Sequence, residues 1–214
     1  MIRLGVELSL PEGSVSVERD GEIVSQISWN RPKLHAEVVY AKIEEALKLA
    51  GAERRDVEEI VVSSGPGSFT GVRLSITVGK AFKATGVKAL SASTLDALSY
   101  GYERLGFTPV PIIPARRGRV YAKVEEDLAD IPLGKLLERV KGLQNPLLIY
   151  KGEVGEIPES IKAVKEPAPL STKLLLMPKN SLSPLTFHYV REHDAKRAEN
   201  PPLQSERRFG AGRD

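Results

Sequence analysis

Apolar and polar residues alternate along the N-terminal part of the chain, which is the pattern of half-buried β-strands. Three strands are predicted, over Ile2–Ser9, Ser14–Glu18 and Ile23–Trp29. The pair Asp20-Gly21 lies between the second and third strands and is a favoured hairpin turn. The chain therefore opens with three antiparallel strands.

Beyond this point, helix-like and strand-like spacings alternate. A helix is predicted from about Ala36 to Ala50, because apolar residues recur there every three to four positions and Gly51 follows. A strand around residue 60, a helix from Thr70 to Thr85, a strand over 87–90 and a helix from Ser93 to about Leu105 come next. Strands followed by alternating helices and strands predict an α/β lobe with a mixed sheet.

Three prolines, at positions 109, 111 and 114, mark a change of region. Beyond them the pattern predicts a hairpin over 110–125, a helix over 133–141 and a strand over 147–150. We expect an N-terminal lobe over residues 1–106, a smaller C-terminal α/β lobe over 107–194, and a mobile tail over 195–214.

Composition narrows the possible functions. Hydrophobic residues make up 41% of the chain and charged residues 28%, as in ordinary globular proteins. There is no run of residues apolar enough to span a membrane and no signal peptide, so no membrane role and a cytoplasmic location are expected. The chain has no cysteine, which excludes disulfides, thiolate zinc ligands and thiol catalysis. A net charge of +3 is too small to indicate nucleic-acid binding by itself.

The most informative segment is Ser63–Arg73, which contains Gly65-Pro66-Gly67 and lies between a strand and a helix. Glycine allows a tight reversal here, and Ser68 or Thr70 can cap the helix that follows. The spacing fits neither the P-loop, because Ala81 follows Gly79-Lys80, nor the dinucleotide fingerprint, which is one residue shorter. Two readings remain: a tight strand-to-helix connection, or a shaped contact surface.

These residues resemble the bacterial TsaB (YeaZ) family. The resemblance is carried by Ser64–Arg73, with Lys80 and Ser93–Asp96 beyond it, and extends to His35 and to Ala115–Tyr121. It implies an actin/Hsp70-like (ribonuclease H-like) ATPase-group fold, an α/β fold with two lobes of which the second is reduced. It covers residues 1–125 well and the remainder weakly.

The resemblance also implies a function. The chain would be a non-catalytic scaffold and activator in forming N6-threonylcarbamoyladenosine at position 37 of tRNAs that read codons starting with A. It would pair with TsaD, the transferase subunit, recruit the ATPase TsaE, pair with itself when TsaD is absent, and meet tRNA through the complex. ATP and magnesium would bind to the partner subunits, and this chain would need no cofactor of its own.

One alternative is a free-standing homodimeric interaction protein unrelated to tRNA, which would keep the helix interface but have no affinity for TsaD. The main alternative is an enzyme acting alone, either an actin-like ATPase or a glycoprotease-like metallopeptidase. Against the ATPase, Glu7 and Pro114 stand where the family commonly has aspartate. Against the peptidase, the His-x-x-x-His pair of the catalytic relative is missing, and His188 and His193 are spaced too far apart for a helical ligand pair. We therefore expect no catalytic residue and no metal site in this chain.

The predicted partner interface follows the glycine loop and the next helix. Small residues four positions apart form a stripe on that helix that would let another helix approach closely, unless the helix is covered within its own domain. Gly79→Leu would then disrupt pairing and leave the monomer folded. The interface comprises Gly65, Pro66, Gly67, Ser68, Phe69, Thr70, Gly71, Leu74, Ser75, Val78, Gly79 and Phe82.

Possible nucleotide or tRNA contacts are the remaining candidates. Guanidinium groups pair well with phosphates, although scattered basic loops are commonly only solvated. His35 is expected to pack or cap at its helix start, with contact to a partner or nucleotide as the other reading. The candidates are His35, Arg73, Arg116, Arg117 and Arg119.

Overall fold

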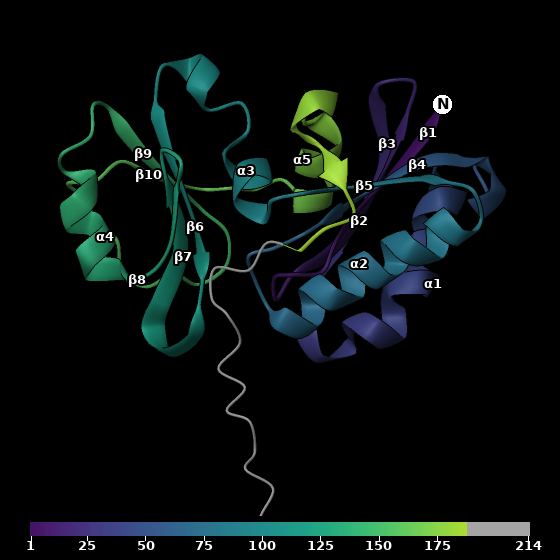
Figure 1. Cartoon of the computed structure of the whole chain (residues 1–214), viewed down its shortest axis with the longest axis horizontal. Helices are drawn as coiled ribbons and strands as arrows, with labels where there is room; N and C mark the ends of the chain where they lie inside the picture. Colours follow the sequence, from purple (N-terminus) through teal and green to yellow (C-terminus); the bar gives the residue numbers. More distant parts are fainter. Residues whose placement is uncertain (188–214) are drawn as a thin grey trace, which may run out of the picture.

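The computed structural model describes residues 1–187 and contains two mixed β-sheets. The first has six strands in the order β11-β5-β4-β1-β2-β3, and the second has five in the order β10-β9-β6-β7-β8. The two sheets form separate lobes with α3 and α5 between them (Figure 1). None of the helices in residues 1–187 is long and apolar enough to cross a bilayer.

The first sheet begins with β1 (Ile2–Glu7), β2 (Gly13–Arg19) and β3 (Glu22–Trp29), which form an antiparallel meander. β4 (Val57–Ser63) pairs with β1 in parallel, and β5 (Lys88–Ala92) pairs with β4 in parallel. Parallel pairing brings the carboxyl ends of β1, β4 and β5 to one edge of the sheet.

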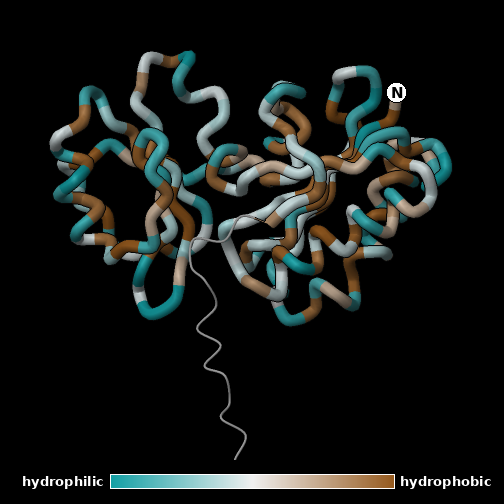
Figure 2. The backbone as a smooth tube through the Cα atoms, viewed as in Figure 1, coloured by the Kyte–Doolittle hydropathy of each residue, from teal (hydrophilic) through white to brown (hydrophobic). Residues whose placement is uncertain are grey.

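Helices cover both faces of this sheet. α1 (His35–Leu49) and α2 (Phe69–Ala84) lie together on one face, and α5 (Leu170–Leu176) packs on the other (Figure 1). Because both faces are covered, every residue of β1 is buried rather than every second one. Figure 2 shows the hydrophobic residues gathered along these central strands.

A buried ion-pair network fastens the sheet to α5. The Arg3 guanidinium donates to Glu59 at 2.8 Å, to Glu18 at 2.6 Å and to the carbonyl oxygen of Leu175 at 3.0 Å. Lys88 bonds the second oxygen of Glu59 at 2.8 Å. Of the described residues, only Arg3 and Glu7 have a buried side-chain polar atom without a hydrogen-bond partner, namely Arg3 Nη2 and Glu7 Oε2.

The second sheet contains β6 (Thr108–Pro114), β7 (Arg119–Val124), β8 (Asp127–Pro132), β9 (Pro146–Tyr150) and β10 (Ala163–Lys165). α4 (Leu133–Val140) contributes Leu136 and Val140 to the core on one face of it. α3 (Thr94–Ser99) packs on the other face, where its Leu95 and Leu98 join Ile113 and Ile149.

The expected fold class, an α/β fold with two mixed sheets and a reduced second lobe, is confirmed, and the first half follows the predicted order. The helix expected to run to Leu105 is wrong in length: it ends at Ser99, and Gly101 adopts a positive φ of 96°. A short 3-10 turn covers Glu103–Leu105.

The last described elements belong to the first sheet. α5 packs on β1, β2 and β4, and β11 (Ser183–Pro184) pairs with β5, although both come from residues expected in the second lobe. The division at residue 106 stays a prediction. The expected tail over 195–214, and His188 and His193, lie outside the described residues.

Candidate functional site at the glycine loop

The glycine loop is closed against the end of β1. The Ser68 amide donates to the Ser9 carbonyl oxygen at 2.7 Å, and the Thr94 amide donates to that of Gly65 at 2.8 Å. A Cβ atom on Gly67, whose φ is 156°, would lie 2.5 Å from the Ser9 carbonyl oxygen. These contacts place the loop between the carboxyl ends of β1 and β5.

The start of α2 packs against the same stretch of backbone, at Leu8 and Ser9. Ser68 accepts a hydrogen bond from the Gly71 amide at 3.4 Å, which confirms Ser68 as the cap. A Cβ atom on Gly71 would lie only 2.0 Å from the Leu8 carbonyl oxygen. The glycines at 67 and 71 are therefore explained by close approach to the chain's own backbone.

Glu7, the acidic residue at the end of β1, is turned into the protein. Its side chain is 1% exposed, and its Oε1 accepts hydrogen bonds from the amide and the hydroxyl of Ser9, both at 2.5 Å. Its Oε2 has no partner within residues 1–187. Burial raises the pKa of Glu7, which the hydrogen bonds from Ser9 only partly oppose. In this position the Glu7 side chain is bonded to Ser9, the residue whose carbonyl oxygen accepts from the glycine loop.

Hydroxyl groups fill the surroundings of this carboxylate. Ser9 bonds Thr94 at 3.1 Å, and Ser63 at the end of β4 bonds Ser75 of α2 at 3.1 Å. These four side chains are fully buried or nearly so. The cluster therefore joins β1, β4, α2 and α3 at the edge of the sheet where the glycine loop lies.

The second lobe approaches the same edge. Lys151, which follows β9, pairs with Glu12 beyond β1 at 3.0 Å. Pro114 ends β6, and its ring would lie 2.9 Å from a Cβ atom on Gly152. The carboxyl ends of β6 and β9 thus face the loop that follows β1, and Pro114 at the end of β6 offers no acidic side chain there.

The small-residue stripe of α2 faces the protein's own sheet. Ser75 bonds Ser63, and a Cβ atom on Gly79 would lie 2.9 Å from Leu185 and 3.4 Å from Val62. Leucine at position 79 would displace the Leu185 side chain, so this part of the stripe is covered within its own domain. The outcome expected for Gly79→Leu stays a prediction.

Burial divides the predicted interface into covered and accessible residues. Buried are Gly65, Pro66, Gly71, Ser75, Val78, Gly79 and Phe82; half-buried are Gly67, Phe69 and Leu74; exposed are Ser68 and Thr70. Only the last two groups offer surface to a partner. The interface itself stays a prediction.

His35 is held on both ring nitrogens. Its Nδ1 accepts from Trp29 Nε1 at 2.9 Å, and its Nε2 lies 2.9 Å from the Leu10 carbonyl oxygen, to which it donates in the tautomer that accepts at Nδ1. The ring packs edge-on to that of Trp29. His35 thereby fastens the start of α1 to β3 and to the loop after β1, as packing at the helix start implies.

The four candidate arginines differ in whether their side chains have a partner within the described residues. Arg119 is bound to Asp130 of β8, with its Nε 2.5 Å from Oδ1, and Arg73 lies over the Phe69 ring at 5.3 Å. Arg116 and Arg117 are exposed, and neither side chain makes a hydrogen bond, ion pair or ring contact among the described residues. The structure therefore does not bring the predicted contact residues into one cluster.

A buried cluster between the lobes was missed by the sequence analysis. Glu166 accepts from the Tyr102 hydroxyl at 3.0 Å and pairs with Lys173 of α5 at 3.3 Å. Burial and the adjacent carboxylate raise the pKa of Tyr102 to about 12. These residues are far apart in the sequence and follow no spacing rule, so no local signal could have found them.

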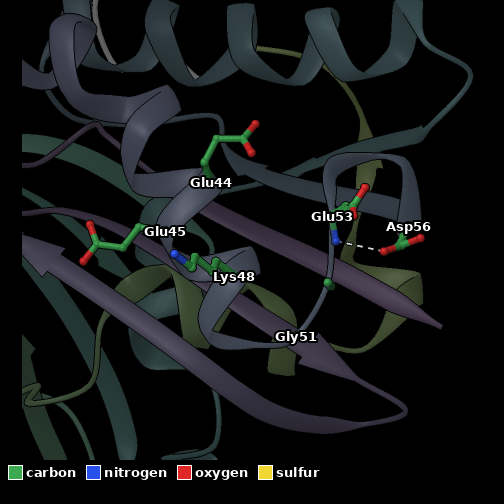
Figure 3. A pocket seen from close by; sticks show the side chains of 7 residues that line it. Glu44, Glu45, Lys48, Gly51, Glu53 and Asp56 are labelled. Carbon is green, nitrogen blue, oxygen red and sulfur yellow. Dashed lines mark hydrogen bonds between the residues drawn. The ribbon is translucent and has the colours of Figure 1, made fainter.

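A surface hollow at the end of α1 does not supply a site. It has a volume of about 600 Å³ and is surrounded by the carboxylates of Glu44, Glu45, Glu53 and Asp56 (Figure 3). Each of these is already engaged: Glu44 by Arg54, Glu45 by Lys42, Glu53 by Arg55, and Asp56 by the Glu53 amide. No group of three or more His, Asp or Glu side chains within residues 1–187 is arranged to hold a metal ion.

Comparison with known proteins places these features in a family. The model of the family described as "TsaD: tRNA N6-adenosine threonylcarbamoyltransferase" matches residues 22–143. TsaB, the tRNA threonylcarbamoyladenosine biosynthesis protein, of Bacillus subtilis is 26% identical over 69% of this chain and 63% of its own length. TsaB of Escherichia coli is 29% identical over 64% of this chain and 61% of its own length. The chain thus spans less than two thirds of the length of these curated relatives.

A transferase and a solved structure are similar as well. The tRNA N6-adenosine threonylcarbamoyltransferase of Rhizobium meliloti is 36% identical over 46% of this chain and 36% of the enzyme. The structure of YeaZ from Pseudomonas aeruginosa superposes with a TM-score of 0.62, at 22% identity over 81% of this chain and 88% of that one. The latter likeness supports the fold alone.

Proposed function

The chain belongs to the TsaD family, and within it to the TsaB (YeaZ) proteins, and from this premise we propose that it acts in forming N6-threonylcarbamoyladenosine on tRNA. In this proposal it is an accessory subunit that pairs with a TsaD transferase and helps to recruit the ATPase TsaE. ATP and magnesium bind to those partners. Such a role would place the chain with its tRNA substrate in the cytoplasm.

The observation that carries the proposal is the placement of Glu7. An enzyme of the actin-like group needs acidic side chains at the ends of early strands to hold magnesium and phosphates. Glu7 instead bonds Ser9 and is 1% exposed, and Pro114 ends the corresponding strand of the second lobe. A chain built in this way is better suited to supporting a partner's active site than to forming one.

The glycine loop supports the same proposal. The loop contacts the backbone of Leu8 and Ser9 at distances that leave no room for a Cβ atom, and hence none for a phosphate group at those points. Its exposed side, with the accessible face of α2, is then a surface of fixed shape. We propose that this surface contacts TsaD, and a second copy of the chain when TsaD is absent.

Reconstitution tests the proposal. Cognate TsaD, TsaE, magnesium-ATP, a threonylcarbamoyl donor and unmodified tRNA would be incubated with and without the chain, and modified adenosine measured by mass spectrometry. We expect modification only when the chain is present, and none from the chain alone. An equal rate without the chain, or modification by the chain alone, would contradict the accessory role.

A pair of variants locates the contact. Arg73→Glu reverses an exposed charge on α2, whereas Lys135→Glu reverses one on α4 of the second lobe. We expect the first to lower the affinity for TsaD and the second to leave it unchanged. Equal effects would remove α2 from the interface.

A further inference from the structure

We propose that the turn formed by Arg116, Arg117 and Gly118 binds the phosphodiester backbone of the RNA substrate. This inference rests on the proposed role in tRNA modification and adds a site of direct RNA contact on this chain. The turn follows β6, at the edge of the second sheet that faces the glycine loop of the first lobe.

The guanidinium groups of Arg116 and Arg117 have no partner within residues 1–187. Most arginines of the described chain are engaged within it: by carboxylates, by carbonyl oxygens or by aromatic rings. Those engaged are Arg3, Arg19, Arg54, Arg55, Arg73, Arg104, Arg119 and Arg139. Within residues 1–187 the side chains of Arg31, Arg116 and Arg117 make none of these contacts, and only the last two are adjacent.

Hydrogen bonds within the second sheet hold the turn in place. The Ala115 amide donates to the Arg119 carbonyl oxygen at 2.8 Å, which closes the turn across its base. Arg119 bonds both the carboxylate and the carbonyl oxygen of Asp130, which ties the turn to β8. Two free cations on a fixed turn lose little conformational freedom of the backbone when they bind an anion.

The backbone of Arg117 is left-handed, with φ 58° and ψ 43°. Glycine, asparagine and aspartate tolerate this region better than arginine. Three other non-glycine residues within 1–187 have a positive φ. The Asp20 side chain accepts from the N-terminal amine at 2.6 Å, and the Asn145 side chain donates to the Gly106 carbonyl oxygen at 2.7 Å. Glu125 lies in the tight β7–β8 turn. Among residues 1–187, only Arg117 combines this conformation with a cation that has no partner there, and such outliers gather at functional positions.

The surroundings favour RNA over a protein partner. Protein interfaces are centred on buried aromatic and aliphatic side chains. No large hydrophobic side chain between residues 107 and 165 is exposed. Paired guanidinium groups without an apolar centre fit phosphate oxygens, which guanidinium forks bind with two parallel bonds.

The test is tRNA binding by the reconstituted complex with TsaD and TsaE, measured by fluorescence anisotropy between 50 and 300 mM salt. We expect Arg116→Glu with Arg117→Glu to weaken binding at least about tenfold and to lower the slope of log affinity against log salt by about 1.5, as two lost phosphate contacts imply. The matched control is Arg54→Glu with Arg55→Glu, an adjacent exposed pair in another 3-10 turn, whose arginines already have carboxylate partners. The control should change neither quantity beyond a small uniform shift.

A second variant separates binding from folding. Arg117→Gly removes one guanidinium and relieves the left-handed backbone, so we expect weaker tRNA binding with an unchanged or higher melting temperature. Complex assembly, followed by light scattering, distinguishes the two proposals. Unchanged tRNA affinity in an assembled double variant would overturn the RNA site and leave the accessory role intact. Loss of TsaD binding in that variant would instead make the turn a protein contact and also overturn the inference. Failure of the unaltered chain to assemble would refute the proposed function itself.

Discussion

Replacing Glu7 by glutamine tests whether the acid at the end of β1 is a buried structural group. Its carboxylate is 1% exposed, and burial raises its pKa above the ordinary value of 4.5. The folded protein therefore keeps the proton to a higher pH than the unfolded chain does. Glu7 contributes its full stability below the unfolded pKa, and that contribution is lost as the pH rises through the folded pKa.

The magnitude follows from this linkage. For every pH unit in which the folded carboxyl keeps its proton and the unfolded one has lost it, the free energy of unfolding falls by about 1.4 kcal/mol. One such unit corresponds to roughly 3–6 °C in melting temperature for a chain of this size. Glu7→Gln retains an oxygen that can accept from Ser9 but has no proton to lose, so it removes this fall.

The assay is urea unfolding of both proteins at pH values from 5 to 8, with Glu22→Gln, an exposed position on β3, as the control. We expect the difference between Glu7→Gln and the unaltered chain to grow in favour of glutamine as the pH rises. A constant offset is also expected, because the new amide group has no partner for its donors, and buried donors without partners cost about 1–3 kcal/mol. The slope is therefore the informative quantity. Parallel curves for the two proteins would refute the reasoning.

Three further outcomes follow from contacts in the first lobe. Arg3→Leu leaves the buried carboxylate of Glu18 without its partner and that of Glu59 with Lys88 alone, and should cost about 3–5 kcal/mol in urea unfolding. Lys88→Met removes a bridge from a largely exposed lysine and should cost about 1 kcal/mol or less. Gly71→Ala places a methyl group 2.0 Å from a carbonyl oxygen and should lower the melting temperature by several degrees, while Gly134→Ala, with open space around it in α4, should raise it slightly. His35→Ala removes the partner of the single tryptophan and should shift its fluorescence to longer wavelength and cost about 1–3 kcal/mol; an unshifted emission would count against the observed hydrogen bond.

Local patterns predicted much of the first lobe. The hairpin at Asp20-Gly21, the apolar stripe of α1 and the cap at Ser68 are decided by neighbours in the sequence, and all three appear in the structure. The motif around Gly65–Gly71 also located the loop correctly. Its partner, the backbone of Leu8 and Ser9, could not be predicted, because that contact depends on how β1 and β4 pair.

Tertiary contacts decided what the sequence analysis missed. α5 is a short apolar stretch that becomes a helix against the far face of the first sheet, and its position depends on strands more than a hundred residues earlier. The stripe at Gly71, Ser75 and Gly79 had two readings that differ only in which face of α2 meets the sheet. Burial against Leu8, Ser63 and Leu185 identifies that face as the inner one.

The most direct test of the accessory role is the mass of the chain mixed with its cognate TsaD, measured by light scattering during size exclusion. We expect a new species at the one-to-one mass, and its loss with Arg73→Glu but not with Lys135→Glu. If each protein keeps its own mass, with and without ATP and TsaE, the proposed pairing is contradicted.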